Sequence, residues 1–271
     1  MSAQHAPPSG SSGHESGESS SPFDRHYHLL RRLHSLSGIV PVGAFLIPHL
    51  TTNSSIVWGS FLNVSKFPNV AEEGGAGVAT FQHEVNFIHS LPALIFIEIF
   101  VLWLPILFHA VLGMKFAHSG RPNLDRYNYQ GNVRYSLQRI TGYVAFLFIV
   151  LHVMSLRFGF EFGGLRPSFD PHAAASTTAH HFPTGSVGLL VAAFYLVGVL
   201  SIVFHFANGL WTAAITWGLT ISVAAQRRWG YVCTAIGIGL GLAAITAVVG
   251  FSTLNLEKAK AVEHQLQAHA S

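Results

Sequence analysis

The stretch VGLLVAAFYLVGVLSIVFHFANGLW, residues 187–211, contains no charged side chain. A helix needs about 20 apolar residues to cross the hydrocarbon core of a bilayer, so this stretch is long enough to span a membrane. Four further stretches have the same apolar character, at residues 34–54, 90–114, 136–157 and 229–252. The sequence therefore predicts an all-α integral membrane protein with five transmembrane helices.

The composition of the whole chain supports this fold class. Only 10% of its residues are charged and 50% are hydrophobic, whereas soluble domains average about 25% charged residues. Residues 1–24 are rich in Ser, Gly and His, lack an apolar stretch, and are expected to form a disordered cytoplasmic tail rather than a signal peptide. The five-span domain is expected over residues 25–254, followed by a polar C-terminal tail over 255–271.

The loops predict the orientation of the chain in the membrane. Basic residues gather on one face: Arg25, Arg31, Arg32, Lys115, Arg121, Arg126, Arg134, Arg139, Arg227 and Arg228. Fewer lie on the opposite face: Lys66, Arg157, Arg166, Lys258 and Lys260. The positive-inside rule then places the N-terminus in the cytoplasm and the C-terminus outside, with the protein in the cell inner (cytoplasmic) membrane. The basic residues are spread over loops, so we expect no nucleic-acid partner.

The opposite face carries most of the acidic residues: Glu72, Glu73, Glu84, Glu161 and Asp170. They lie in two long connections, which exceed ordinary loop lengths and are expected to hold short surface helices or caps.

The single cysteine, Cys233, excludes an intrachain disulfide, an iron–sulfur cluster held by this chain alone and a covalently attached CxxCH haem. Any haem would therefore be of the b type.

Histidines in the spans are the candidate ligands. His49, His109, His152 and His205 lie one in each of the first four spans, and the fifth span has none. With a rise of 1.5 Å per residue, His49 pairs in depth with His152 and His109 with His205, at levels ~15 Å apart. Two bis-histidine b haems in a four-helix bundle, with the fifth span beside it, require this arrangement. The alternatives are hydrogen-bonded core histidines and a transition-metal transporter, for which further acidic or thiolate ligands are expected.

Four motifs resemble a known family. They are RRLHSLSGIVPVGAFLIPHL (31–50), SLPALIFIEIFVLWLPILFHAVLG (90–113), LQRITGYVAFLFIVLHV (137–153) and VGVLSIVFHFANGLWTAAITWG (197–218). Together they are similar to the di-haem cytochrome b membrane-anchor subunit of succinate:menaquinone oxidoreductases, in the complex II family. The resemblance covers roughly residues 25–250.

The resemblance implies that the four histidines are axial haem ligands. His49 and His152 would hold the outer haem, and His109 and His205 the inner one. It also implies partner flavoprotein and iron–sulfur subunits on the cytoplasmic face, which perform the dicarboxylate chemistry while this chain passes electrons to menaquinone. The chain would then be no enzyme by itself. The anchor of a fumarate reductase, working in the opposite direction, is the alternative within the family.

Cationic and polar residues at the cytoplasmic edge could bind the propionates of the inner haem. Arg31 and His34 are the candidates, together with Arg32 and Arg139. The competing interpretation is that the arginines are anchors whose charged ends reach the membrane surface. Small residues at Gly38, Gly43, Gly113, Gly142, Gly198 and Gly209 would let either a porphyrin or a neighbouring helix approach closely.

Glu98 is the only carboxylate inside a predicted span. It precedes His109 by 11 residues, which places it ~16 Å farther out and within ~20° of the His109 face of an ideal helix. A buried acid is costly unless it functions or is well paired. Glu98 is therefore a candidate proton carrier at a quinone site. A protonated glutamate bonded to a neighbouring helix is the alternative, and a quinone site near Arg31, His34 and Ser37 is the positional alternative.

Overall fold

The computed structural model describes residues 22–61, 75–119, 130–161 and 169–268, and every regular element in these ranges is helical. Five helical segments are long and apolar enough to cross a membrane: Tyr27–Phe61, Leu94–His118, Val133–Leu156, Gly185–Thr216 and Val223–Ser252. The predicted all-α fold with five spans is thus confirmed. The tail before residue 22 lies outside the described residues, as do several loop residues used to predict orientation: Lys66, Glu72, Glu73, Arg121, Arg126 and Arg166.

The first two spans each contain a π-helical segment. After the short α1 (Pro22–Arg25), the first span consists of α2 (Tyr27–Ser37), the π-helix η1 (Gly38–Gly43), α3 (Ala44–Trp58) and the 3₁₀ turn η2 (Gly59–Phe61). The second consists of α5 (Leu94–Phe96), the π-helix η4 (Ile97–Trp103) and α6 (Leu104–Ser119). Pro41 lies within η1, and Pro105 is the second residue of α6, just after η4. Because proline has no N–H, the α-helical ladder is interrupted near both segments.

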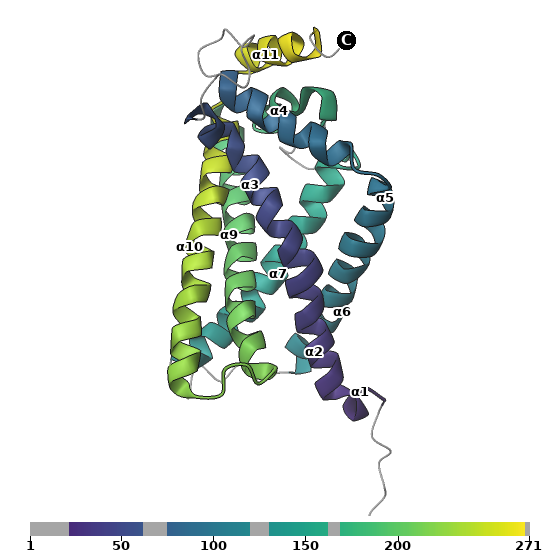
Figure 1. Cartoon of the computed structure of the whole chain (residues 1–271), viewed down its shortest axis with the longest axis vertical. Helices are drawn as coiled ribbons and strands as arrows, with labels where there is room; N and C mark the ends of the chain where they lie inside the picture. The colour runs from purple at the N-terminus through teal and green to yellow at the C-terminus, as the bar shows by residue number, and fades with distance from the viewer. Residues whose placement is uncertain (1–21, 62–74, 120–129, 162–168, 269–271) are drawn as a thin grey trace, which may run out of the picture.

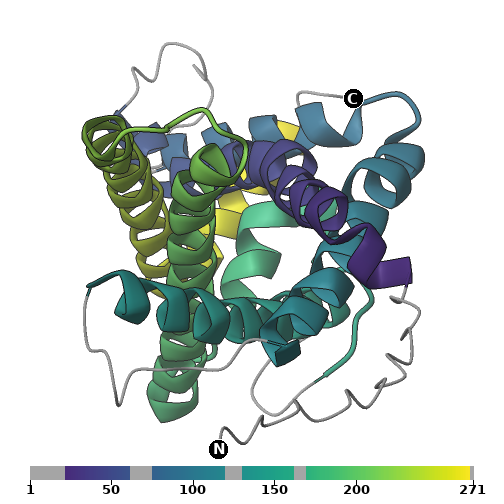
Figure 2. The same cartoon turned by 90° about the horizontal axis from the view of Figure 1, so that it is seen from below.

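The other three spans are uninterrupted helices, α7 (Gln130–Leu156), α9 (Gly185–Thr216) and α10 (Val223–Ser252). The helix α9 packs against both α7 and α10, and α10 also packs against α3. Seen from below in Figure 2, the first span, α6, α7 and α9 surround one axis, and α10 lies beside α9. The first four spans therefore form a bundle, with the fifth outside it (Figure 1).

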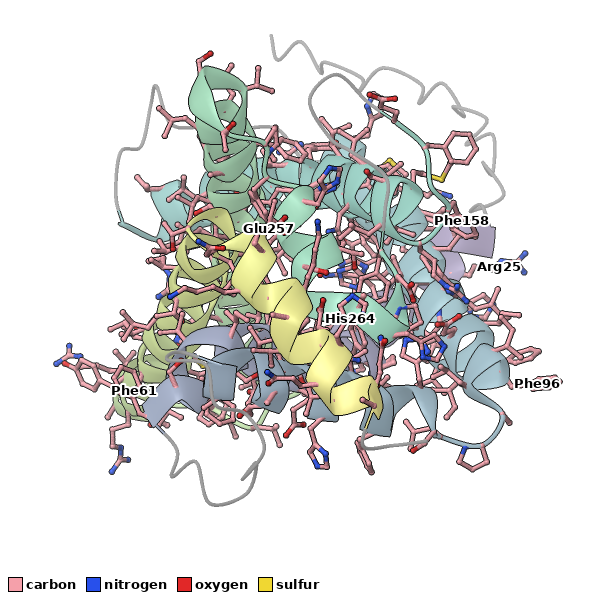
Figure 3. The ribbon with its side chains drawn as sticks, turned by 90° about the horizontal axis from the view of Figure 1, so that it is seen from above. Arg25, Phe61, Phe96, Phe158, Glu257 and His264 are labelled. Carbon is pink, nitrogen blue, oxygen red and sulfur yellow. The ribbon has the colours of Figure 1, made fainter. Side chains whose placement is uncertain are left out.

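Short helices cover one end of this bundle. They are α4 (Gly75–His89), η5 (Pro171–Ala173), α8 (Ala174–His180) and α11 (Leu256–Ala268), which we call the end cap. Figures 1 and 3 show α11 and α4 lying across this end. The helices expected in the two long connections are present. The C-terminal segment, predicted as a polar tail, also forms a helix, because Val262 and Ala259 are buried in the cap.

The opposite end of the bundle is where α2 begins and α9 ends, and we call it the basic end. Within the described residues it carries these basic side chains: Arg25, Arg31, Arg32, Lys115, Arg134, Arg139, Arg227 and Arg228. Between the two ends the surface is apolar. Phe61, Phe96 and Phe158 point outward at the periphery in Figure 3 and are largely exposed. Phe61 and Phe96 belong to the first and second spans, and Phe158 lies two residues beyond the third, so these side chains mark the cap-side edge of the apolar surface.

Side-chain hydrogen bonds hold the end cap together. Gln82 of α4 is buried, its Oε1 accepts from the Ala174 N–H at 3.0 Å, and its Nε2 donates to the Pro171 carbonyl at 2.6 Å. Its Nε2 also donates to Oδ1 of Asn86 at 2.9 Å. In α11, Oε1 of the buried Glu263 accepts from the Ser176 N–H at 2.9 Å. Helix α8 is therefore fixed from two sides.

We expect Gln82→Leu to lower the free energy of unfolding by about 2 to 4 kcal/mol, because it leaves the buried Ala174 N–H and the part-buried Pro171 carbonyl without their partner. Denaturant unfolding of the protein in detergent measures this change. Asn86→Ala is the matched control, since this exposed residue loses only one bond of the same set, and its effect should stay within about 0.5 kcal/mol. Equal effects of the two variants would show that Gln82 does not fix the cap.

Candidate functional site

The structure brings the four span histidines together in two pairs. The cap-side pair consists of His49 from α3 and His152 from α7, with ring centroids 6.0 Å apart and planes at 79°. The basic-side pair consists of His109 from α6 and His205 from α9, also 6.0 Å apart, with planes at 87°. The pairing expected from depth in the membrane is therefore present. Within the described residues, no group of three or more His, Cys, Asp or Glu side chains could hold a metal ion.

The separation within each pair suits one iron between two imidazoles. A metal–imidazole bond is about 2 Å long and the ring centroid lies about 1 Å behind the nitrogen, so two ligands on opposite sides have centroids about 6 Å apart. Both pairs have this spacing. Each pair also supplies two imidazoles, the number of axial ligands in a six-coordinate b haem. The residues present thus fit the group that the sequence predicts.

Main-chain carbonyls orient both rings of the basic-side pair. Nδ1 of His109 lies 2.8 Å from the His34 carbonyl, and Nδ1 of His205 lies 3.0 Å from the Gln138 carbonyl. A carbonyl oxygen can only accept, so each Nδ1 carries the proton and each Nε2 keeps its lone pair. Metal-bound histidines commonly show this arrangement, in which the second nitrogen donates to a carbonyl or carboxylate.

A buried polar network supports His205 from behind. Nε2 of Gln138 donates to the His205 carbonyl at 3.1 Å, and Oε1 of Gln138 accepts from Nδ2 of Asn208 at 2.8 Å. Oδ1 of the buried Asn208 accepts in turn from Nε of Arg134 at 2.9 Å. The Arg134 guanidinium lies over the ring of Trp211, 4.0 Å from its centroid. These contacts fix α7 against α9 at the level of the basic-side pair.

Glycines leave room for the same rings. A β-carbon at Gly38 would clash with Cε1 of His109, and one at Gly142 would lie 2.9 Å from Cε1 of His205. Gly43 and Gly198 similarly give space to the rings of neighbouring phenylalanines. The glycines noted in the sequence therefore admit side chains that pack within the bundle.

The cap-side pair has a different environment. The His49 ring stacks on Phe45 with centroids 5.1 Å apart, and the His152 ring stacks on Phe148 at 5.5 Å. Nδ1 of His152 lies 3.2 Å from the hydroxyl of Tyr195, a side chain of α9. Tyr195 precedes His205 by ten residues on the same helix, so the two pairs are ~15 Å apart along the bundle. Tyr195 could not be identified from the sequence, since only the packing of α7 on α9 brings it to His152.

His34 and Arg31 lie toward the basic end. The His34 ring stacks on His109 with centroids 4.0 Å apart, and its Nδ1 is buried without a hydrogen-bond partner among the described residues. Arg31 donates to the Tyr27 hydroxyl at 3.0 Å, and Arg31 and Arg32 line a pocket of about 340 Å³. A buried nitrogen without a partner, near a cationic pocket, fits an anionic group of a bound cofactor.

Arg139, the other cationic candidate, donates to the Ala117 carbonyl in the last turn of α6. Its guanidinium therefore stabilises a helix C-terminus.

Glu98 lies at the cap-side end of the second span and forms an ion pair with Arg157. Its Oε2 is 3.0 Å from the Arg157 guanidinium, and the two side chains are 22% and 53% exposed. The expected alignment with His109 assumed a continuous α-helix. Glu98 lies in the first turn of the π-helix η4, which has more residues per turn than an α-helix, so this estimate of the angle does not apply.

Comparisons with known proteins identify the family of the chain. No family model matches the chain. The chain is 34% identical, over 221 residues, to the succinate dehydrogenase cytochrome b558 subunit of Bacillus subtilis (strain 168). This alignment covers 82% of the present chain and 95% of the relative. The chain belongs to the cytochrome b subunits of succinate dehydrogenase. As a member of this family it is a multi-pass membrane protein, and the transition-metal transporter is not favoured.

The network behind His205 gives a stability prediction for this cytochrome b subunit. Asn208→Leu should lower the free energy of unfolding by about 2 to 4 kcal/mol, because Gln138 and Arg134 each lose a part-buried partner. Thermal unfolding in detergent measures the loss. Ser201→Ala, on the same helix, removes a hydroxyl that bonds only to the Val197 carbonyl one turn earlier. It should change stability by no more than about 0.5 kcal/mol. A similar, small effect of both variants would contradict the role of the network.

Proposed function

We propose that this chain is the haem-binding anchor of a succinate dehydrogenase, which holds two b haems and connects an iron–sulfur subunit with menaquinone. One observation carries the proposal: two imidazole pairs, each with centroids 6.0 Å apart, are stacked along one four-helix bundle. The name of the Bacillus subtilis relative, a cytochrome b, supports haem b as the cofactor. When bound, each haem would carry one electron at a time along the bundle.

His109 and His205 would hold the inner haem and His49 and His152 the outer haem. The carbonyls of His34 and Gln138 keep the basic-side imidazoles in the tautomer that can bind iron. Arg31, Arg32 and His34 would bind the propionates of the inner haem, because they offer positive charge and a buried nitrogen beside His109. The chain would therefore hold and orient its cofactors and neutralise the charge of their propionates.

The basic end would receive the flavoprotein and iron–sulfur subunits in the cytoplasm. The gathering of arginines there supports a cytoplasmic N-terminus under the positive-inside rule, and hence the C-terminus outside. The chain has a single cysteine and cannot hold an iron–sulfur cluster alone, so the clusters would belong to a partner. The succinate chemistry would belong to the flavoprotein. The relative is named for succinate dehydrogenase, which supports succinate oxidation rather than fumarate reduction as the direction.

The quinone would react near the cap-side pair, with Glu98 as the proton carrier. Arg157, which pairs with Glu98, follows His152 by five residues, or ~8 Å toward the end cap. Reduction of a quinone consumes two protons with two electrons, so a carboxylate between the outer haem and the surface would deliver protons to it. The Arg157 guanidinium, 3.0 Å from Oε2 of Glu98, would hold this carboxylate in place at the cap-side end of the second span.

Substitution of the ligands tests the pairing. His109→Ala or His205→Ala should remove one spectral species, and His49→Ala or His152→Ala the other, because iron loses an axial donor. Reduced-minus-oxidised spectra of purified membranes measure haem content. His89→Ala, an exposed histidine in the end cap, is the control and should keep both haems. Loss of the same haem from His49→Ala and His109→Ala would overturn the assignment.

The quinone role of Glu98 has its own test in the assembled complex. We expect Glu98→Gln to keep both haems and dye-linked succinate oxidation, and to lower quinone-linked turnover about 100-fold, because an amide cannot carry a proton. Arg157→Gln breaks the same ion pair but leaves the carboxylate, so it should lower turnover far less. Normal quinone turnover in Glu98→Gln, or equal losses in the two variants, would exclude the proton-carrier role.

A further inference from the structure

The two histidine pairs differ in what holds their second ring nitrogens. Main-chain carbonyls accept from both rings of the basic-side pair. In the cap-side pair, Nδ1 of His152 faces the Tyr195 hydroxyl at 3.2 Å, and the same hydroxyl lies 2.7 Å from Nε2 of His181. A continuous chain of three side chains therefore runs from the proposed haem ligand to a residue directly after α8.

The chemistry of the ligand sets the direction of these hydrogen bonds. Nε2 of His152 must keep its lone pair to bind iron, so the ring proton is on Nδ1 and is donated to the Tyr195 oxygen. The Tyr195 hydroxyl proton then points to Nε2 of His181, which accepts it. His181 consequently has its own proton on Nδ1. The hydrogen bonds therefore select one tautomer of His152 and one of His181.

The three hydrogen-bonded side chains of His152, Tyr195 and His181 are enclosed by apolar rings. Tyr195 is 7% exposed and His181 is 1% exposed. The Tyr195 ring packs on Phe148 and Phe182, with centroids 5.2 and 5.1 Å away. In such a low-dielectric setting hydrogen bonds are strong and unpaired polar groups are costly, so the side chains have little freedom to reorient.

We propose that Tyr195 and His181 are positioning residues for the outer haem, which set the tautomer, ring plane and donor strength of His152. The proposal rests on the proposed haem-binding function. An axial imidazole that donates its second N–H is a more basic ligand. A more basic ligand favours ferric over ferrous iron. The hydrogen bonds from His152 through Tyr195 to His181 therefore lower the reduction potential of the outer haem.

The end cap takes part in this arrangement. His181 directly follows α8, which is bonded to Gln82 of α4 and Glu263 of α11 through the main-chain N–H groups of Ala174 and Ser176. The orientation of His152 is therefore coupled to cap packing. The basic-side ligands depend on carbonyls of their own bundle helices, which a side-chain substitution cannot remove.

Tyr195→Phe is the primary test, because it removes the hydroxyl and keeps the aromatic packing. We expect both haems to remain and the potential of the outer haem to rise, with a change of up to tenfold in its reduction equilibrium, or about 59 mV. The EPR spectrum of its ferric form should also change, since its g values depend on the angle between the imidazole planes. The inner haem should keep its wild-type reduction potential and EPR spectrum. Tyr143→Phe, exposed on α7, is the control and should change neither haem.

His181 provides a second, independent pair of variants. His181→Leu removes the acceptor of the Tyr195 hydroxyl and should shift the outer haem in the same direction. His181→Gln offers a carbonyl oxygen in its place and should restore most of the wild-type potential and spectrum. The loss of the shift in the conservative variant distinguishes a hydrogen-bonding role from a packing role.

The outcomes separate this inference from the proposed function. Two haems with an unchanged outer potential and EPR spectrum in Tyr195→Phe would overturn the positioning role and leave the di-haem assignment intact. An equal shift of both haems, or equal shifts in His181→Leu and His181→Gln, would also overturn it. A wild-type chain without two haems would instead refute the proposed function itself.

Discussion

A neutral imidazole inside a membrane-spanning bundle needs an acceptor for its ring N–H, and this requirement shapes the surroundings of His109, His205 and His152. Lipid-facing helices offer no water, so an unpaired ring nitrogen is costly. In the basic-side pair the partners are carbonyls, and His34 and Gln138 must therefore face His109 and His205 across helix interfaces. The close packing at Gly38 and Gly142, where no β-carbon fits easily, follows from this need.

In the cap-side pair, His152 meets the same requirement with a side chain instead. The hydroxyl of Tyr195 lies between His152 and His181, and His181 depends on a helix that belongs to the end cap. The end cap thus contributes to the interior of the bundle as well as covering it. Gln82 and Glu263, which lie far from His152 in the sequence, are part of the same set of constraints.

Much of this arrangement could be predicted from the sequence, because a helix has a regular rise. Depth alone pairs His49 with His152 and His109 with His205, and the structure places these rings together. The orientation of Glu98 could not be predicted in this way, because the π-helix η4 changes the number of residues per turn. Tyr195 and His181 were missed because their contacts depend on how α8 and α9 pack. The C-terminal helix α11 was missed because its apolar residues are few and find their partners in the end cap.

The helix α9 carries both His205 and Tyr195, and it contributes to both histidine pairs. It is an uninterrupted α-helix from Gly185 to Thr216, whereas the first two spans contain π-helical segments. The spacing of the two histidine pairs along the bundle is therefore set by the regular rise of one continuous helix. A thicker or thinner bilayer changes the tilt of such a bundle, but it leaves this distance unchanged. Under the proposed function, the distance that an electron crosses between the two histidine pairs would therefore be the same in bilayers of different thickness.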